Sequence, residues 1–209
     1  MRLEPLKQTQ KEIARHLKLT PIEGPIKTIA GFGCKAQGRQ LFCAVAVFSY
    51  PDLKLLESKT IEREQPMPYI PGFMAFREGK LMLELYYQLE YDPDVLMVPG
   101  HGIAHPLKCG VASFLGHELH KPCIGVAKHL MTGATVEGEK IVMDNEVRGL
   151  LVTTKKHAKP VYVSPGQLIT IEQAAELVQK TIVPPHKMPE PVHVASRFAK
   201  KAAKARQPS

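Results

Sequence analysis

The segment Leu41–Ser49, with the sequence LFCAVAVFS, limits the fold more than any other part of this chain. Its residues are almost all apolar, several are β-branched or aromatic, and no polar side recurs along it. Such a run is typical of a β-strand that is covered on both faces. The apolar stretch Ile26–Cys34 precedes it, residues 53–62 alternate loosely in polarity, and turn-like residues separate the three segments. The sequence therefore predicts three consecutive antiparallel strands.

The rest of the chain alternates between helix and strand patterns. Apolar residues recur at helical spacing in four segments: residues 6–17, Lys80–Leu89, Cys109–Leu119 and Thr170–Lys180. Apolar segments typical of strands are Pro93–Val98, Pro122–Ala127, Lys140–Val152 and Pro160–Ser164. The third of these contains Asp144-Asn145, which indicates a hairpin turn. Antiparallel strands followed by alternating helices and strands predict an α/β fold with a mixed central sheet flanked by helices.

The charge of the chain favours an anionic partner. Its 209 residues carry a formal net charge of +8, with a sequence pI of about 9.3. Nucleic acid is the usual partner of such a protein, although charge can also serve solubility alone. Much of the excess follows residue 183, where prolines lead into lysines and arginines interleaved with alanine. We expect one domain over residues 1–183 and a basic tail over residues 184–209, either disordered or helical on nucleic acid.

The cysteines and the hydropathy pattern bear on compartment. The chain contains no apolar run near the ~18 residues of a membrane span, and its N-terminal segment is polar. Its four cysteines form no C-x-x-C pair: Cys34, Cys43, Cys109 and Cys123. Free, mostly buried thiols in a cytoplasmic protein without a membrane partner are expected.

Residues 68–78 read PYIPGFMAFRE and form the first motif with a chemical meaning. Prolines on both sides of Tyr69 and Ile70 fix φ and remove backbone donors, which predicts a rigid loop with an aromatic and an aliphatic tip. Such a tip can wedge between stacked bases, or it can simply pack on the core. Gly72, after Pro71, permits close approach of the backbone to a base or to another strand.

Residues 98–106, VPGHGIAHP, form a second motif. Two glycines and a proline argue against a helix here, so His101 and His105 are not a helical metal pair. These histidines are expected to contact phosphate, to orient a water or to be structural. The H-x-x-H spacing of His117 and His120 is a weak indication of zinc.

Lys128 directly follows a predicted buried strand, where the cleft of an open α/β sheet usually forms. It is expected either to contact a phosphate or to lie free on the surface. Small residues at Gly72, Gly110 and Ala127 would suit a tight pocket for an extruded base.

These blocks together resemble the signature of the endonuclease V family, nucleases that nick DNA or RNA near deaminated adenine. The resemblance extends from about Ile26 to Phe198 and includes GVAS at 110–113, IGVAK at 124–128 and PEPVHVASR at 189–197. It implies a ribonuclease H-like fold, a monomer, a role in DNA repair, recognition of inosine, and carboxylates that hold magnesium or manganese. It aligns Glu78 with a metal-binding carboxylate and, more loosely, Glu172 with a further acidic position.

The chain departs from the family pattern where the metal should be held. Gly33 stands in the aspartate position of the I-A-G-x-D strand, and Pro99 stands in the aspartate position of D-G-H-G. Phe114 replaces a histidine of the A-S-H block. The nearest acid with a related place, Asp94, is expected at the other end of its strand, roughly 16 Å away.

These departures weaken the expected chemistry. Magnesium binds through hard anionic oxygens, and phosphodiester hydrolysis needs the metal to activate water and stabilise the leaving oxygen. We therefore expect a protein that binds DNA or RNA with impaired or absent nuclease activity. One alternative is a working metal-dependent endonuclease that uses Glu78 and Glu172, with His101 or His105. Another is a protein-interaction module on a repurposed fold.

Overall fold

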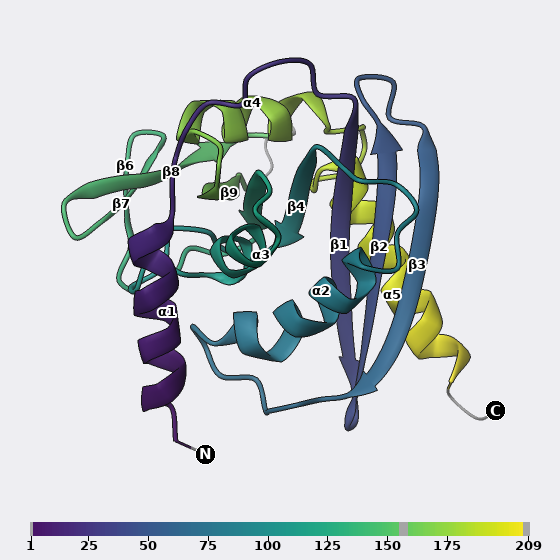
Figure 1. The fold of residues 1–209 in the computed structure, drawn as a ribbon. Helices are drawn as coiled ribbons and strands as arrows, with labels where there is room; N and C mark the ends of the chain where they lie inside the picture. The colour runs from purple at the N-terminus through teal and green to yellow at the C-terminus, as the bar shows by residue number, and fades with distance from the viewer. Residues whose placement is uncertain (1, 155–158, 207–209) are drawn as a thin grey trace.

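Within residues 2–154 and 159–206, which a computed structural model of the chain describes, nine strands form one mixed sheet in the order β3-β2-β1-β4-β5-β9-β8-β7-β6 (Figure 1). The strands are β1 (Thr28–Gln37), β2 (Gln40–Ser49), β3 (Leu55–Glu64), β4 (Val95–Pro99), β5 (Cys123–Ala127), β6 (Thr135–Glu137), β7 (Lys140–Met143), β8 (Glu146–Val152) and β9 (Val161–Gln167). The helical segments are α1 (Glu4–His16), the π-helical turn η1 (Ala75–Gly79), α2 (Lys80–Tyr86), α3 (Val111–Leu119), α4 (Ile171–Lys180) and α5 (Glu190–Ala205). The predicted α/β fold with a mixed, helix-flanked sheet is confirmed.

The three antiparallel strands predicted from the apolar run are also confirmed. β2 contains that run, and each of its residues from Leu41 to Phe48 is buried. β1 pairs with β2 along its whole length, from Thr28 opposite Ser49 to Gln37 opposite Gln40. β3 is the exposed edge strand, and its charged side chains suit a strand with one unpaired side.

Three positions that the sequence singled out, Gly33, Pro99 and Lys128, lie towards the carboxyl ends of neighbouring parallel strands in the middle of the sheet. β1 and β4 are parallel, with Gly31 opposite Met97, so that Gly33 and Pro99 lie at the same level two residues further on. β5 is the next parallel strand, and Lys128 directly follows its last residue. The carboxyl ends of such strands are where clefts of α/β sheets form.

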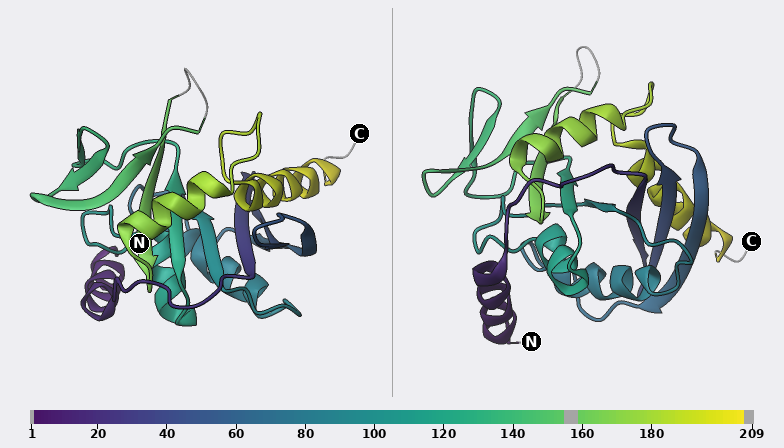
Figure 2. Two further views of the ribbon diagram at one scale, coloured as in Figure 1. Left: turned by 90° about the horizontal axis from the view of Figure 1, so that it is seen from above. Right: turned by 45° about the horizontal axis from the view of Figure 1, so that its top comes forward.

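Different helices cover the two faces of the sheet (Figure 2). On one face, α2 and α3 pack on β1, β2 and β4, with Met82 and Leu115 fully buried. On the other face, α4 and the start of α5 pack on β4, β5 and β9, with Val178 and Val192 buried. None of the helices within the described ranges combines the length and hydrophobicity that crossing a membrane requires.

The C-terminal segment is not a free tail, and the expectation of a separate basic tail from residue 184 is wrong in this respect. α5 packs across β1 and β2 (yellow in Figure 1). Its buried residues are Pro191, Val192, Val194, Ala195, Ala199 and Ala203. A proline in the first turn is compatible with a helix. The small alanines between the lysines therefore provide a narrow apolar stripe that seats the helix on the sheet.

The expectation of four free thiols is also wrong. Cys34 and Cys43 face each other across β1 and β2, with their Cα atoms 4.1 Å apart, and form a disulfide. Their spacing in the sequence does not reveal this pair, because the hairpin register brings them together. Cys109 and Cys123 are free and buried, as expected. Burial raises the pKa of the Cys109 thiol to about 12, which makes it unreactive.

Candidate functional site

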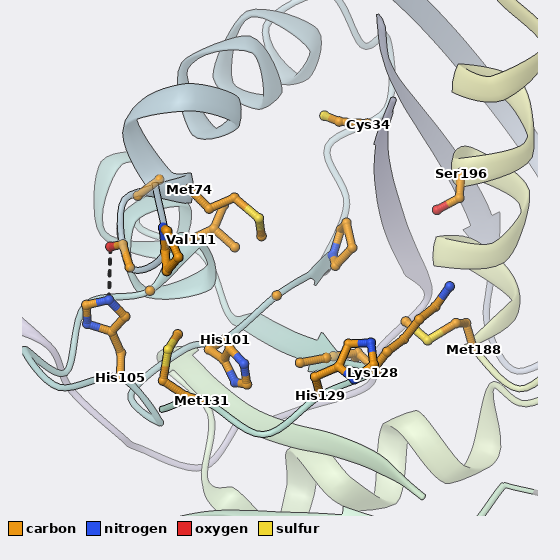
Figure 3. A pocket seen from close by; sticks show the side chains of 18 of the residues that line it. Cys34, Met74, His101, His105, Val111, Lys128, His129, Met131, Met188 and Ser196 are labelled. Atoms are coloured by element: carbon orange, nitrogen blue, oxygen red, sulfur yellow. Dashed lines mark hydrogen bonds between the residues drawn. The ribbon is translucent and has the colours of Figure 1, made fainter. Parts of the chain in front are cut away.

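A pocket of about 690 Å³ opens beyond the ends of β4 and β5, between residues 69–75 and α5 (Figure 3). Most of the side chains that the sequence singled out line it, namely Tyr69, Pro71, Gly72, Pro99, His101, His105, Gly110 and Lys128. Ile70, Gly33, Glu78 and Glu172 are not among its lining residues. The fold therefore assembles most of the predicted recognition residues in one place, with the exception of Ile70 and without the predicted carboxylates.

The two tip side chains of the PYIP loop point to different places, one to the pocket and the other to the core. Tyr69 is 62% exposed at the rim, where the Arg77 guanidinium carbon lies 5.6 Å from the centre of its ring. Ile70 instead packs with Met67 and Phe76 in a small apolar cluster beside α1. The aromatic tip is thus available to a ligand, whereas the aliphatic tip is committed to packing.

His105, in the second motif, forms a hydrogen bond with this loop. The backbone N–H of Leu107 donates to Nδ1 of His105 at 3.1 Å, so the proton of the neutral ring lies on Nε2. Nε2 then donates to the carbonyl of Gly72 at 3.0 Å. The fully buried Gln10 of α1 donates to the same carbonyl at 2.9 Å and to the carbonyl of Cys109 at 2.8 Å. The sequence did not reveal Gln10, because nothing local distinguishes a glutamine on a helix.

His101 belongs to the same loop and is partly buried. Its Nδ1 is buried and has no hydrogen-bond partner among the described residues. Burial and the neighbouring His105 lower the pKa of His101 to about 4, against the opposing effect of the His129 backbone. The backbone of this loop is tightly folded, since a Cβ on Gly110 would stand 2.1 Å from the carbonyl oxygen of His101. His101 is therefore a neutral ring at physiological pH and cannot attract phosphate by charge.

Glu78 is buried and paired. Its Oε1 accepts a hydrogen bond from Nη1 of Arg77 at 2.9 Å, and both side chains are nearly inaccessible to solvent. Burial raises the pKa of the Glu78 carboxyl, while Arg77 acts in the opposite direction. Arg77 also donates to Oε1 of Gln65 at 2.7 Å. The carboxylate is thus already neutralised by a guanidinium.

At Gly33 the structure leaves no room for a side chain. A Cβ on Gly33 would stand 2.4 Å from the backbone nitrogen of Ser196 and 2.5 Å from its Cα. A Cβ on Gly31, on the same face of β1, would stand 2.0 Å from the carbonyl carbon of Pro191. α5 therefore rests directly on the backbone of β1 at the position where the family pattern has an aspartate.

The other two positions that differ from the family pattern, Phe114 and Pro99, also carry side chains that cannot bind a metal. Phe114 is buried, and its ring centre lies 5.9 Å from that of Phe76. Pro99 ends β4 and lines the pocket without offering a donor or a charge. Asp94 lies at the opposite end of β4, as expected, where its Oδ2 accepts hydrogen bonds from the backbone N–H groups of Lys27 and Thr28.

The residues present do not fit a magnesium or manganese site. Within residues 2–154 and 159–206, no cluster of three or more histidine, cysteine, aspartate or glutamate side chains could hold a metal. No aspartate or glutamate of these residues lines the pocket. Glu172 is exposed at the start of α4, away from the pocket lining. Among the described residues, none joins His117 and His120 in a cluster that could hold zinc.

The electrostatic character of the pocket is basic. In Figure 3, Lys128 and Ser196 lie on the side next to Met188, opposite Met74 and His105. The further basic residues that line the pocket are His129, His193, Arg197 and Lys200. The last three belong to α5, and the sequence did not place them here because their segment was expected to be a free tail.

Comparisons with known proteins agree with this geometry. The family profile for endonuclease V matches residues 8–197. Endonuclease V of Geotalea uraniireducens is 35% identical over 204 residues, which cover 94% of this chain and 87% of that protein. The protein of the same name from Trichormus variabilis is 37% identical over 202 residues, with 91% of each chain covered.

Solved structures give the same result for the fold. Endonuclease V from Bacillus subtilis superposes with a TM-score of 0.91 at 25% identity, covering 98% of this chain and 93% of that one. The catalytic domain of human endonuclease V superposes with a TM-score of 0.90 at 25% identity, covering 97% and 96%. The mixed sheet, the helices on both faces and these superpositions define a ribonuclease H-like α/β protein. The chain belongs to the endonuclease V family.

Proposed function

We propose that this protein binds nucleic acid in the pocket and cleaves it poorly or not at all. The observation that carries the proposal is the composition of the pocket: an exposed Tyr69 at its rim, several cationic side chains in its wall, and no described carboxylate. Family membership supports nucleic acid as the ligand, since the relatives are named for an endonuclease.

The binding half of the proposal rests on complementarity. Nucleic acid offers phosphates to cations and flat bases to aromatic rings, and a protein that binds single strands combines the two. Tyr69 and Lys128 provide one of each on the same pocket. A volume of about 690 Å³ is also large enough for a base turned out of its stack.

The catalytic half rests on the donor set. Two aspartate positions are Gly33 and Pro99, and Glu78, the carboxylate that remains, is buried against Arg77. A divalent cation in such a site would need more anionic oxygen ligands than the pocket lining offers. Metal-dependent hydrolysis is therefore not part of the proposed function.

The test is a paired binding and cleavage assay. Matched DNA and RNA strands, with and without inosine, are incubated with the protein in magnesium and in manganese. We expect saturable binding without nicking. Metal-dependent nicking that Glu78→Ala abolishes would instead support a working endonuclease, as the names of the relatives suggest. Absence of binding to every strand by the folded protein would favour a protein-interaction role.

A further inference from the structure

Three cationic side chains from two separate segments line the pocket. Lys128 follows β5, and Arg197 and Lys200 stand three residues apart on α5, so that both project from one side of that helix. Ser196 and Cys34, the neighbours of Gly33 in space and in sequence, line the same pocket, as does Pro99. The cations therefore border the two positions where the family pattern has metal-binding aspartates.

These cations are available to a ligand. All three side chains are exposed, and none of them forms an ion pair with another residue in the part of the chain that the structure describes. Other basic residues are engaged: Lys121 pairs with Asp92 at 2.7 Å and Arg148 pairs with Asp144 at 2.7 Å. Free cations around a pocket without carboxylates create a positive potential that only an anion can balance.

The surroundings of His193 indicate which of the lining residues carry the positive charge. Burial is the largest cause of the lowered pKa of His193; His186, Arg197 and Lys200 act in the same direction, and Glu190 opposes them. The ring of His193 therefore favours its neutral form, and the fixed positive charge among these lining residues resides on Lys128, Arg197 and Lys200. A guanidinium presents paired donors to phosphate oxygens, and an ammonium acts as a compact point charge.

We propose that Lys128, Arg197 and Lys200 hold a phosphate of the bound nucleic acid directly, in the place where a divalent cation would otherwise link protein and phosphate. This inference rests on the proposed function and makes it more specific. Binding then needs no metal, because the cations are part of the chain. It also depends steeply on salt, because each phosphate contact releases condensed counterions.

The experiment measures fluorescence anisotropy of a labelled, inosine-containing single DNA strand over a series of salt concentrations, in magnesium and in EDTA. The test variant is R197A/K200A. The matched control is K201A/K204A, which removes the same charge from exposed positions of the same helix that do not line the pocket. Circular dichroism confirms that both variants are folded.

We expect binding to persist in EDTA, with an affinity at least equal to that in magnesium, because Mg²⁺ competes with the side-chain cations for phosphate. For R197A/K200A, the slope of log K against log salt should fall by roughly 1.4, about 0.7 for each lost contact, while the control retains a steeper slope. Lys128→Ala should lower the slope by about half as much. Equal losses in the two double variants, or loss of wild-type binding in EDTA, would overturn the phosphate site while leaving nucleic-acid binding in place. If the wild type binds no strand at low salt, the proposed function itself fails.

Discussion

Gly33 of β1 and Ser196 of α5 are in direct backbone contact, so that a Cβ on Gly33 would stand 2.4 Å from the Ser196 nitrogen. The missing aspartate is therefore not a simple gap that a single substitution refills. The backbone of α5 occupies the space that a side chain at position 33 would need, and basic residues of α5 line the pocket. Loss of a carboxylate and gain of cations are two consequences of one packing arrangement.

This contact predicts that side chains at position 33 destabilise the protein. Gly33→Ala should lower the free energy of unfolding by about 1–3 kcal/mol, because the backbone of α5 must shift to admit the methyl group. Gly33→Asp should lower it further, since a charge would be buried against a helix backbone. Urea denaturation followed by circular dichroism measures both.

Pro99→Asp is the control, because position 99 faces the pocket and not the helix backbone. It should fold with nearly wild-type stability. The double variant Gly33→Asp/Pro99→Asp should not gain metal-dependent cleavage, since α5 would still occupy the site. A stable Gly33→Asp protein with restored nicking would show that α5 moves aside easily.

Gln10 predicts a stability effect far from the pocket opening. Its amide connects Gly72 of the PYIP loop to Cys109, which lies shortly after the second motif. Gln10→Ala removes a donor from the buried carbonyl of Cys109 and from the part-buried carbonyl of Gly72, and should cost about 2 kcal/mol. Gln8→Ala, on an exposed position of the same helix, should cost less than about 0.5 kcal/mol. Similar unfolding midpoints for the two variants would contradict this role of Gln10.

Much of the fold was predictable because its signals are local. The apolar run of β2 and the helical spacing of α4 each depend on a few neighbouring residues. The hairpin between β7 and β8 was indicated by Asp144 and Asn145, whose φ angles of 53° and 60° are tolerated by these residue types. The PYIP and histidine motifs likewise indicated part of the pocket lining, including Tyr69, His101 and His105.

The remainder depends on contacts between distant segments. The packing of α5 on the sheet was missed because alanine gives a weak apolar signal between lysines, and only the bare backbone of Gly31 and Gly33 lets that helix approach. The disulfide between Cys34 and Cys43 requires the register of β1 and β2. The hydrogen bond from Arg77 to Glu78 could not be predicted either, because neighbouring residues in a sequence do not have to pair with each other.

The histidine that joins the two motifs predicts a dependence of stability on pH. Burial lowers the pKa of His105 from its usual 6.5 to about 4, with Arg148 adding to the effect and the Gly72 bond opposing it. The folded state therefore binds fewer protons than the unfolded state between these values. Stability is complete above pH 6.5 and falls as the pH drops towards 4, by roughly 3 kcal/mol from this ring.

Comparison with His105→Gln isolates this contribution. The difference in unfolding free energy between wild type and variant should shrink as the pH falls from 6.5 to 4. Subtraction is needed because the raised pKa of Glu78 acts with the opposite sign, adding stability at low pH. A constant difference between wild type and His105→Gln would show that His105 does not titrate in this way.

The exposed ring of Tyr69 predicts that base stacking contributes to the affinity for nucleic acid. A base stacked on an aromatic side chain contributes about 1–3 kcal/mol, so Tyr69→Ala should raise the Kd for a single strand by about tenfold or more. The slope of log K against log salt should stay the same, because no charge is removed. Tyr87→Ala is the matched control: this tyrosine is 73% exposed but lies on the C-cap of α2, outside the pocket. If both tyrosine variants bind like the wild type, or if both lose the same affinity, Tyr69 is a loop residue without a role in stacking.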